Sequence, residues 1–241
     1  MRLLQTWRLV AVALLVAGGF ACGRPADVSQ AQPAAQAPLP EPGQLPESQR
    51  VVITILGDSL TAGLGLTVAE AYPARIQEMF ATEGYRDVEI SNAGVSGDTT
   101  AGGLRRIESL LGPNVRIVVV ALGGNDALRG LGVAQTRENV SAIVSGLLER
   151  GIRVMVAGME SPTNLGDDYQ RGFHEAFAQV NATYRGRITF VPFLLEGVAG
   201  NPALNQPDGI HPNAQGARIV AEHLYPLLRG MVDQLPVGPS S

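Results

Sequence analysis

The chain has no lysine and only one cysteine among its 241 residues. A single cysteine excludes an internal disulfide, and it also excludes a zinc site built from several cysteines. The 18 arginines are outnumbered by 22 acidic residues, which gives a formal net charge of −4. Proteins that bind nucleic acid carry a basic surplus, so we expect no nucleic-acid partner.

Motifs for metals and phosphate-bearing cofactors are missing as well. No H-E-x-x-H pair or cluster of carboxylates in the sequence indicates a metal site. Ser96–Thr99 supplies a glycine and hydroxyl groups, but it lacks the lysine of a phosphate-binding loop. We therefore expect neither a metal nor a cofactor.

The first 21 residues have the pattern of a secretory signal peptide. Arg2 and Arg8 precede a short apolar run from Leu9 to Ala17, which matches the charged start and hydrophobic middle of such a signal. A membrane-spanning helix needs about 20 apolar residues, so this run is too short for a permanent anchor. We expect residues 1–21 to be removed and the protein to be exported into a bacterial envelope.

Cys22 directly follows this signal, at the place where bacterial lipoproteins carry the residue that is acylated. Ala21 fits a lipoprotein signal, whereas Gly19 and Phe20 depart from the usual pattern. Two interpretations stay open: a lipid anchor on Cys22 that holds the protein at the membrane, or cleavage after Ala21 that releases it into the periplasm with a free thiol. Residues 22–49 are rich in alanine, proline and glutamine, a composition that predicts an extended tether.

From Val51 onward, short β-branched apolar runs alternate with amphipathic segments. The predicted strands cover residues 51–56, 88–90, 115–122, 153–157 and 188–191, and the predicted helices cover residues 69–81, 100–111, 136–150, 169–184 and 212–232. This alternation implies right-handed crossovers on one parallel sheet. We therefore predict an α/β domain over residues 50–233, a flavodoxin-like three-layer α/β/α sandwich with a five-stranded parallel sheet. A tail over residues 234–241 follows, and we expect a monomer.

Polar clusters follow the first three predicted strands, at Gly57–Ser59, Asn92–Gly94 and Gly123–Asp126. In folds of this kind, ligands bind beyond the carboxyl ends of the strands. Ser59 stands on the turn after the first strand, where many hydrolases place a nucleophile, although the second glycine of the G-x-S-x-G motif is absent. The alternative is a serine that caps the following helix.

The segment Asp208–Pro212 contains the groups that a serine nucleophile requires. A serine hydroxyl needs a base within hydrogen-bond reach, which His211 can provide. Asp208 can turn back through the intervening glycine to orient the imidazole, and Pro212 suits the first position of the last helix. The alternative is an Asx turn with a capping histidine.

Acyl transfer also needs hydrogen-bond donors that face the oxyanion. Asn125 offers a side-chain amide after the third strand, and Gly94 offers a backbone N–H that no side chain obstructs. Each of the two could instead be a loop residue that provides special backbone angles.

In this order, the clusters resemble the SGNH hydrolases, also called GDSL esterases. The stretches similar to the first, second, third and fifth blocks of that family are Gly57–Leu60, Gly94, Gly123–Asp126 and Asp208–Pro212. The resemblance implies that Ser59 is the nucleophile, His211 the base and Asp208 its partner. It also implies an oxyanion hole formed by the amides of Ser59 and Gly94 and the side chain of Asn125.

Three further stretches, Ser96–Leu104, Gly123–Leu131 and Pro162–Asn164, resemble the thioesterase I, lysophospholipase and arylesterase branch. This likeness implies an enzyme that hydrolyses small aryl or acyl esters, with thioesters and lysophospholipids as further candidate substrates. Two alternatives stay open: a carbohydrate O-deacetylase of the same superfamily, and a non-catalytic binding module tethered to the envelope.

Several side chains in the predicted loops could bind the acyl ester. The candidates are Leu128, Arg129, Leu131, Met159 and Pro162. Arg129 would suit an anionic headgroup, and the alternative for it is a solvated surface arginine. The apolar candidates could equally be ordinary anchors that hold the loops to the core.

The only tryptophan, Trp7, lies within the predicted signal peptide. Removal of residues 1–21 would leave tyrosine as the main fluorophore, so we expect protein isolated from the bacterial envelope to lack indole emission. The unprocessed chain serves as the control in the same fluorescence measurement. An indole band in the exported protein would mean that the first segment is retained.

Overall fold

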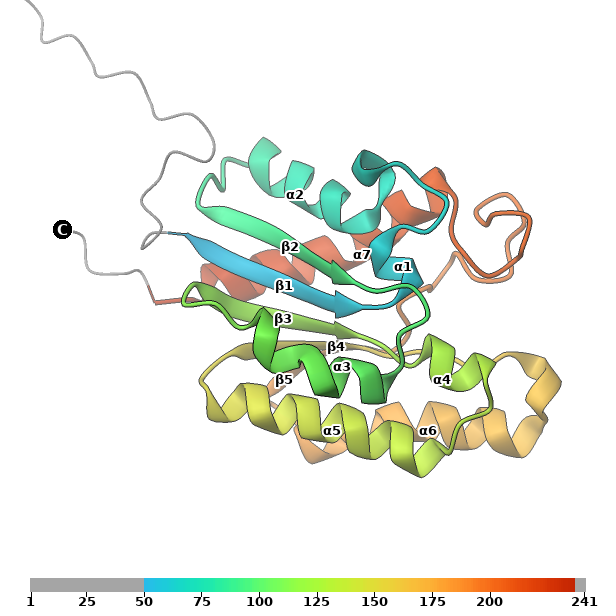
Figure 1. Cartoon of the computed structure of the whole chain (residues 1–241). Helices are drawn as coiled ribbons and strands as arrows, with labels where there is room; N and C mark the ends of the chain where they lie inside the picture. The colour runs from blue at the N-terminus through green and yellow to red at the C-terminus, as the bar shows by residue number, and fades with distance from the viewer. Residues whose placement is uncertain (1–49, 237–241) are drawn as a thin grey trace, which may run out of the picture. The chain divides into compact units, whose positions relative to one another are not determined.

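The computed structural model describes residues 50–236, which form an α/β fold around one sheet. All strand pairs are parallel, in the order β2-β1-β3-β4-β5 (Figure 1). The strands are β1 (Val51–Gly57), β2 (Val88–Gly94), β3 (Val115–Ala121), β4 (Arg153–Ala157) and β5 (Ile188–Val191). This confirms the predicted five-stranded parallel sheet and its flavodoxin-like order. The predicted signal peptide, Cys22 and the tether lie outside the described residues.

Helices cover both faces of the sheet and so produce the three predicted layers (Figure 1). One face carries α2 (Tyr72–Thr82) and α7 (Ala214–Asp233), and the other carries α3 (Thr100–Arg106), α5 (Val133–Glu149) and α6 (Asp167–Thr183). The shorter helical turns are α1 (Ser59–Ala62), η2 (Val68–Glu70), η3 (Ile107–Leu110), α4 (Gly124–Leu128) and η4 (Thr163–Leu165). Between residues 50 and 236, no helix is both long and apolar enough to cross a bilayer.

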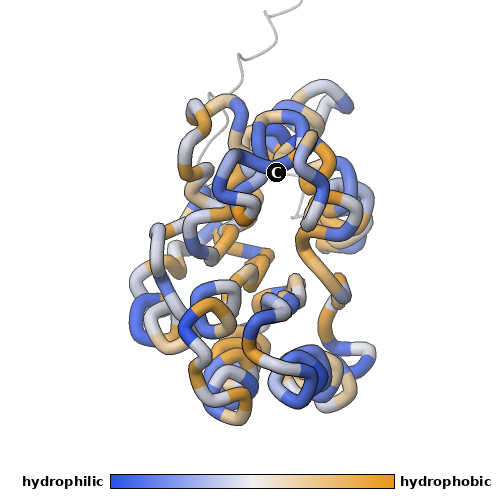
Figure 2. The backbone as a smooth tube through the Cα atoms, turned by 90° about the vertical axis from the view of Figure 1, so that its right-hand side faces the viewer, coloured by the Kyte–Doolittle hydropathy of each residue, from blue (hydrophilic) through white to orange (hydrophobic). Residues whose placement is uncertain are grey.

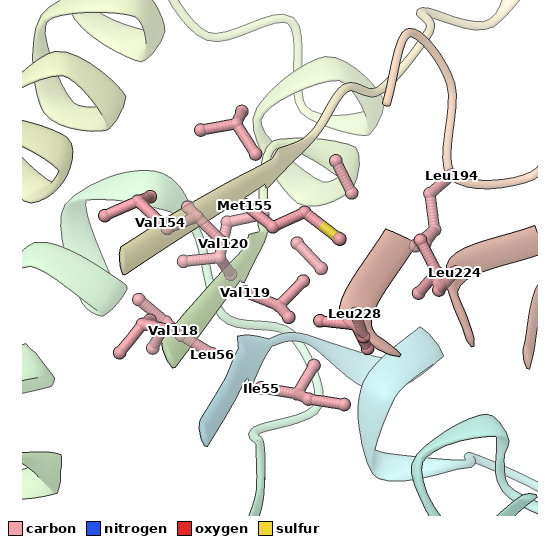
Figure 3. Close-up of a cluster of buried hydrophobic side chains, with 14 of the residues drawn as sticks. Ile55, Leu56, Val118, Val119, Val120, Val154, Met155, Leu194, Leu224 and Leu228 are labelled. Carbon is pink, nitrogen blue, oxygen red and sulfur yellow. The ribbon is translucent and has the colours of Figure 1, made fainter. Parts of the chain in front are cut away.

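The core consists of apolar side chains that line up across the central strands. Ile55 of β1 is the register partner of Val119 of β3, which is in turn the partner of Met155 of β4. All three are fully buried, and Leu224 and Leu228 of α7 belong to the same buried cluster (Figure 3). Because helices cover both faces of the sheet, the central strands are continuous apolar runs rather than alternating ones.

Four of the five predicted helices begin two or three residues away from the predicted position, and two of these differences have a clear local cause. The predicted helix at residues 69–81 is interrupted by the extended Ala71, and α2 begins at Tyr72 with Pro73 in its first turn, a position that suits proline. The last helix begins at Ala214, because the Asn213 side chain accepts hydrogen bonds from the Gln215 and Gly216 N–H groups and so caps it. The expectation that Pro212 occupies the first helical position is therefore wrong, since it precedes the cap.

The carboxyl ends of the strands bring together segments that are distant in the sequence. Ser59 follows β1, Gly94 ends β2, and Asn125 follows β3 in the turn α4. Residues 205–213 reach the same edge, where the Gln206 side chain donates a hydrogen bond to the Leu64 carbonyl. Within this segment, Asn205 forms an antiparallel bridge with Pro212. Figure 2 faces this edge and shows hydrophilic and hydrophobic residues mixed along its loops.

Candidate active site

Ser59 lies at the first position of α1, directly after β1. The preceding Asp58 caps this short helix, since its Oδ1 accepts a hydrogen bond from the Leu60 N–H at 3.0 Å. The first N–H groups of a helix have no acceptor within the helix. The Ser59 N–H is one of these groups and can donate a hydrogen bond to an external anion. A glycine precedes Asp58 because a Cβ on Gly57 would lie 1.9 Å from the Thr61 hydroxyl.

The Ser59 hydroxyl contacts the imidazole of His211, the base proposed for it from the sequence. The distance from Ser59 Oγ to His211 Nε2 is 2.8 Å, across a separation of 152 residues. This distance is within the range over which a base accepts the proton of a nucleophile.

Asp208 holds the other nitrogen of the imidazole. Its Oδ2 lies 2.7 Å from His211 Nδ1, and its Oδ1 accepts hydrogen bonds from the backbone N–H groups of His211 and Ile210. These two backbone bonds and the bond to the imidazole lower the pKa of Asp208 to about 2. An ionised Asp208 keeps the proton of a neutral His211 on Nδ1 and leaves Nε2 free to accept one from Ser59.

Gln206, which is not among the predicted site residues, holds in place the loop that carries Asp208 and His211 (the histidine loop). The Gln206 N–H donates to the carbonyl of His211 at 2.7 Å. Its side-chain amide donates to the carbonyls of Leu64 at 2.7 Å and Pro212 at 3.0 Å. The bond to Leu64 connects the histidine loop to the segment after α1, and Gly65 is required there because a Cβ would lie 2.2 Å from Gln206 Oε1.

Asn125, the predicted side-chain donor to the oxyanion, lies at the start of α4. Its Nδ2 donates one hydrogen bond to Asp58 Oδ2 at 3.3 Å. Because an amide nitrogen carries two hydrogens, the second is available for a substrate oxygen. The close approach of α4 depends on Gly124, where a Cβ would already lie 3.2 Å from Asp58 Oδ2.

Gly94, the predicted backbone donor, is engaged within the protein. Its N–H donates to Asn92 Oδ1 at 2.9 Å, and the Asn92 amide donates to the carbonyl of Thr61 at 2.9 Å. Glycine is required here by packing, because a Cβ would lie 2.2 Å from the backbone nitrogen of Ala62. To serve an oxyanion, the Gly94 N–H would have to be shared with Asn92.

A buried carboxylate supports the turn that carries Asn125. Asp126 is 2% exposed, and it accepts hydrogen bonds from the Thr100 N–H at 2.9 Å and the Thr100 hydroxyl at 2.5 Å. The Thr136 hydroxyl also donates to it, and Asn139 donates to the Thr100 hydroxyl. This network connects α4 to α3 and α5. It therefore fixes the position of the Asn125 backbone relative to these two longer helices.

An apolar cleft of about 550 Å³ opens beside Ser59. Three predicted substrate-binding residues line it, namely Leu128, Met159 and Pro162. Arg129 and Leu131 are not among the lining residues; Arg129 donates to the Gly97 carbonyl at 2.8 Å, and the Leu131 carbonyl accepts a bond from a tyrosine hydroxyl. The other apolar side chains of the wall, which the prediction omits, are Leu60, Phe193, Leu195, Ala199 and Ile210.

Two acidic residues of this cleft are also absent from the prediction. Asp58 is 1% exposed, and burial raises its pKa to about 6 against the opposing effect of its bonds from Leu60 and Asn125. Glu160 lies in the wall beside Met159. An acid before the serine is visible in the sequence, but only the tertiary structure places Glu160 here. Between residues 50 and 236, no three histidine, cysteine or acidic side chains converge as metal ligands would.

Comparison with known proteins places these features in a family. The model of the GDSL-like Lipase/Acylhydrolase family matches residues 55–219. The chain is 37% identical to Esterase TesA of Pseudomonas aeruginosa over 75% of this chain and 89% of that protein. It is 30% identical to Arylesterase of Vibrio mimicus over 70% of this chain and 84% of that protein.

Solved structures agree with these sequence relatives. The crystal structure of TesA has a TM-score of 0.70 and 37% identity, covering 75% of this chain and 99% of the other. The crystal structure of AlinE4, an SGNH-hydrolase family esterase, has a TM-score of 0.62 and 42% identity, covering 78% of this chain and 97% of the other.

The buried Asp58 should make the stability of the fold depend on pH. Between its ordinary pKa of 3.8 and its folded pKa of about 6, only the folded chain keeps the proton. The unfolded chain then binds fewer protons, so the stability from this group is complete below pH 3.8 and is lost as the pH rises through 6. Relative to Asp58→Asn, which cannot titrate, the wild-type free energy of unfolding should fall by roughly 2 kcal/mol between pH 4 and pH 7.

Urea denaturation of both proteins at each pH measures this difference. Titrating groups that do not interact with Asp58 contribute equally to the two curves and cancel in the comparison. A difference between wild type and variant that stays constant from pH 4 to pH 7 would show that Asp58 titrates at its ordinary value.

Proposed function

The chain belongs to the GDSL-like lipase/acylhydrolase family of carboxylic ester hydrolases, and on that basis we propose that it is an exported serine esterase. Its substrates are aryl or short acyl esters, which Ser59 cleaves through an acyl-enzyme. The observation that carries this proposal is the 2.8 Å hydrogen bond between Ser59 Oγ and His211 Nε2, at the mouth of an apolar cleft.

In the acylation step, the Ser59 hydroxyl attacks the ester carbonyl while His211 Nε2 takes its proton. Ionised Asp208 stabilises the imidazolium that forms. The charge that develops on the carbonyl oxygen is stabilised by the Asn125 amide, by the Ser59 N–H, and by the Gly94 N–H, which is shared with Asn92 Oδ1. When this intermediate collapses, the bond to the leaving oxygen breaks, His211 returns the proton to that oxygen, and the alcohol departs from the acylated serine.

Deacylation uses the same groups with water in place of serine. His211 takes a proton from water as the water oxygen attacks the acyl carbonyl. The second tetrahedral intermediate then releases the carboxylic acid, and Ser59 Oγ recovers its proton from His211. Because both steps develop charge on one oxygen, the same donors serve each of them.

The cleft favours an acyl or aryl group as the part of the substrate that is bound. Its volume of about 550 Å³ is within the range of small-molecule sites, and most of its wall is apolar. This lining disfavours the sugar ring of a carbohydrate O-deacetylase substrate. The complete set of Ser59, His211, Asp208 and Asn125 disfavours a non-catalytic binding module.

Thioesters and lysophospholipids extend the proposed range of substrates. A relative in Escherichia coli K12, 31% identical over 75% of this chain and 85% of that protein, carries the name Thioesterase 1/protease 1/lysophospholipase L1. A thioester presents the same carbonyl to Ser59 and releases a thiol, so the acylation chemistry is unchanged. The apolar cleft suits the acyl chain of either substrate.

The proposed location is the bacterial envelope, with the protein acting as a monomer. The support is the signal-like pattern of residues 1–21 and the tether-like composition of residues 22–49. Cys22 would carry a lipid anchor that holds the enzyme at the membrane, and without the lipid the enzyme would be periplasmic.

Ser59→Ala should lower the kcat for p-nitrophenyl butyrate by at least about 10⁴-fold, because the nucleophile is removed. Ser145→Ala on α5 is the matched control, since that serine bonds to Glu149 on the same helix and does not line the cleft; its activity should equal wild type. Both proteins should unfold cooperatively. Full turnover by Ser59→Ala would assign the nucleophile to another residue.

Asn125→Ala should lower kcat by about 10² to 10³-fold with a smaller change in KM, because the lost bond strengthens as charge develops on the substrate oxygen. Steady-state kinetics on the same ester measure the two parameters separately. A variant that raises KM alone would make Asn125 a substrate-binding residue, and one with wild-type kinetics would remove it from the oxyanion hole.

A further inference from the structure

The charged side chains that line the cleft carry one sign. Among the described residues of its wall, only Asp58 and Glu160 are charged, and neither lysine, arginine nor histidine lines it. Asp58 is enclosed beneath Ser59, whereas the Glu160 side chain is 36% exposed. Glu160 is therefore the acid that an incoming substrate group meets in the wall.

The Glu160 carboxylate is held in position by α6. His174 Nδ1 lies 2.7 Å from Glu160 Oε1, so the carboxylate is restrained on the wall of the cleft. Asp208, whose carboxylate is ionised in the adjoining histidine loop, adds charge of the same sign.

No arginine offsets this charge within the cleft. Arg129 points to the Gly97 carbonyl, and Arg171, one turn before His174, pairs with Asp168. An anionic substrate group would have to lose hydration on entering an apolar cleft and would then be repelled by the Glu160 carboxylate in its wall.

We propose that Glu160 is a specificity-determining residue, which makes the enzyme select uncharged or cationic acyl esters over anionic ones. The inference rests on the proposed esterase function and specifies its substrate class. It follows that neutral thioesters are better substrates than polyanionic ones such as acyl-CoA, and that zwitterionic or neutral lipid esters are better than acidic ones.

Two esters that differ in one charge test this selectivity. p-Nitrophenyl butyrate is neutral, and the mono-p-nitrophenyl ester of glutaric acid carries a carboxylate at the end of its acyl chain. The readout is the ratio of kcat/KM for the neutral ester to that for the anionic ester at pH 8 and low salt. We expect wild type to favour the neutral ester, Glu160→Gln to lower the ratio by about 3- to 10-fold, and Glu160→Lys to lower it further.

Glu138→Gln is the matched control, because it removes one negative charge from an exposed position on α5 that does not line the cleft. Its ratio should equal that of wild type. The ionic strength provides a measurement that needs no variant: salt screens exposed charges, so the wild-type ratio should fall as NaCl rises from about 0.02 to 0.5 M.

The outcomes separate the two proposals. Wild type that hydrolyses neither ester would overturn the esterase function itself. Wild type that hydrolyses the neutral ester, but whose ratio is unaltered by Glu160→Gln or by salt, would overturn the role of Glu160 and leave the esterase function standing. An equal fall in the ratio for Glu138→Gln would attribute the selectivity to net charge rather than to this carboxylate.

Discussion

The hydrogen bond between Ser59 and His211 is the contact on which the site depends, and much of the surrounding structure holds it in place. Its two residues are 152 positions apart in the sequence, so no local contact along the chain can hold them together. On one side, a short helix that begins at Ser59 is seated against β2, where only glycine fits at position 94. On the other, Gln206 connects the histidine loop to the carbonyl of Leu64. The geometry of proton transfer is thus set by backbone contacts rather than by the two side chains alone.

Two carboxylates of the site have pKa values displaced in opposite directions. Asp208 accepts backbone and imidazole hydrogen bonds in an accessible loop and stays ionised, as a partner of an imidazolium must. Asp58 is enclosed beneath Ser59, and desolvation favours its neutral form in spite of the bonds from Leu60 and Asn125. Burial of this acid reduces stability at neutral pH, and the same acid caps α1 and positions the Asn125 amide in the wall of the cleft. The protein is less stable with a buried acid at this position, but the donors to the oxyanion are held in an ordered arrangement.

The elements that the sequence predicts well are those with a strong local pattern. The central strands are mostly apolar runs, and the long helices at 136–150 and 169–184 have clear amphipathic faces, so their positions agree with the structure to within a few residues. The start of α7 was misplaced because Pro212 suits a first helical turn, whereas the side chain of Asn213 provides the actual cap. Short helices such as α4 cannot be predicted from hydrophobic periodicity, because four or five residues are too few to show a helical repeat.

The sequence by itself determined the order of the strands and helices, the chemical groups at the ends of the strands, and the pairing of a serine with an Asp-Gly-Ile-His segment. These follow from local composition and from the rule that parallel strands present their carboxyl ends at one edge. Tertiary structure alone decided that Gln206 connects the histidine loop to Leu64, and that Glu160 rather than Arg129 lies in the wall of the cleft. Such contacts join segments that approach one another only after the sheet has formed. The spacing of residues along the chain therefore does not predict them.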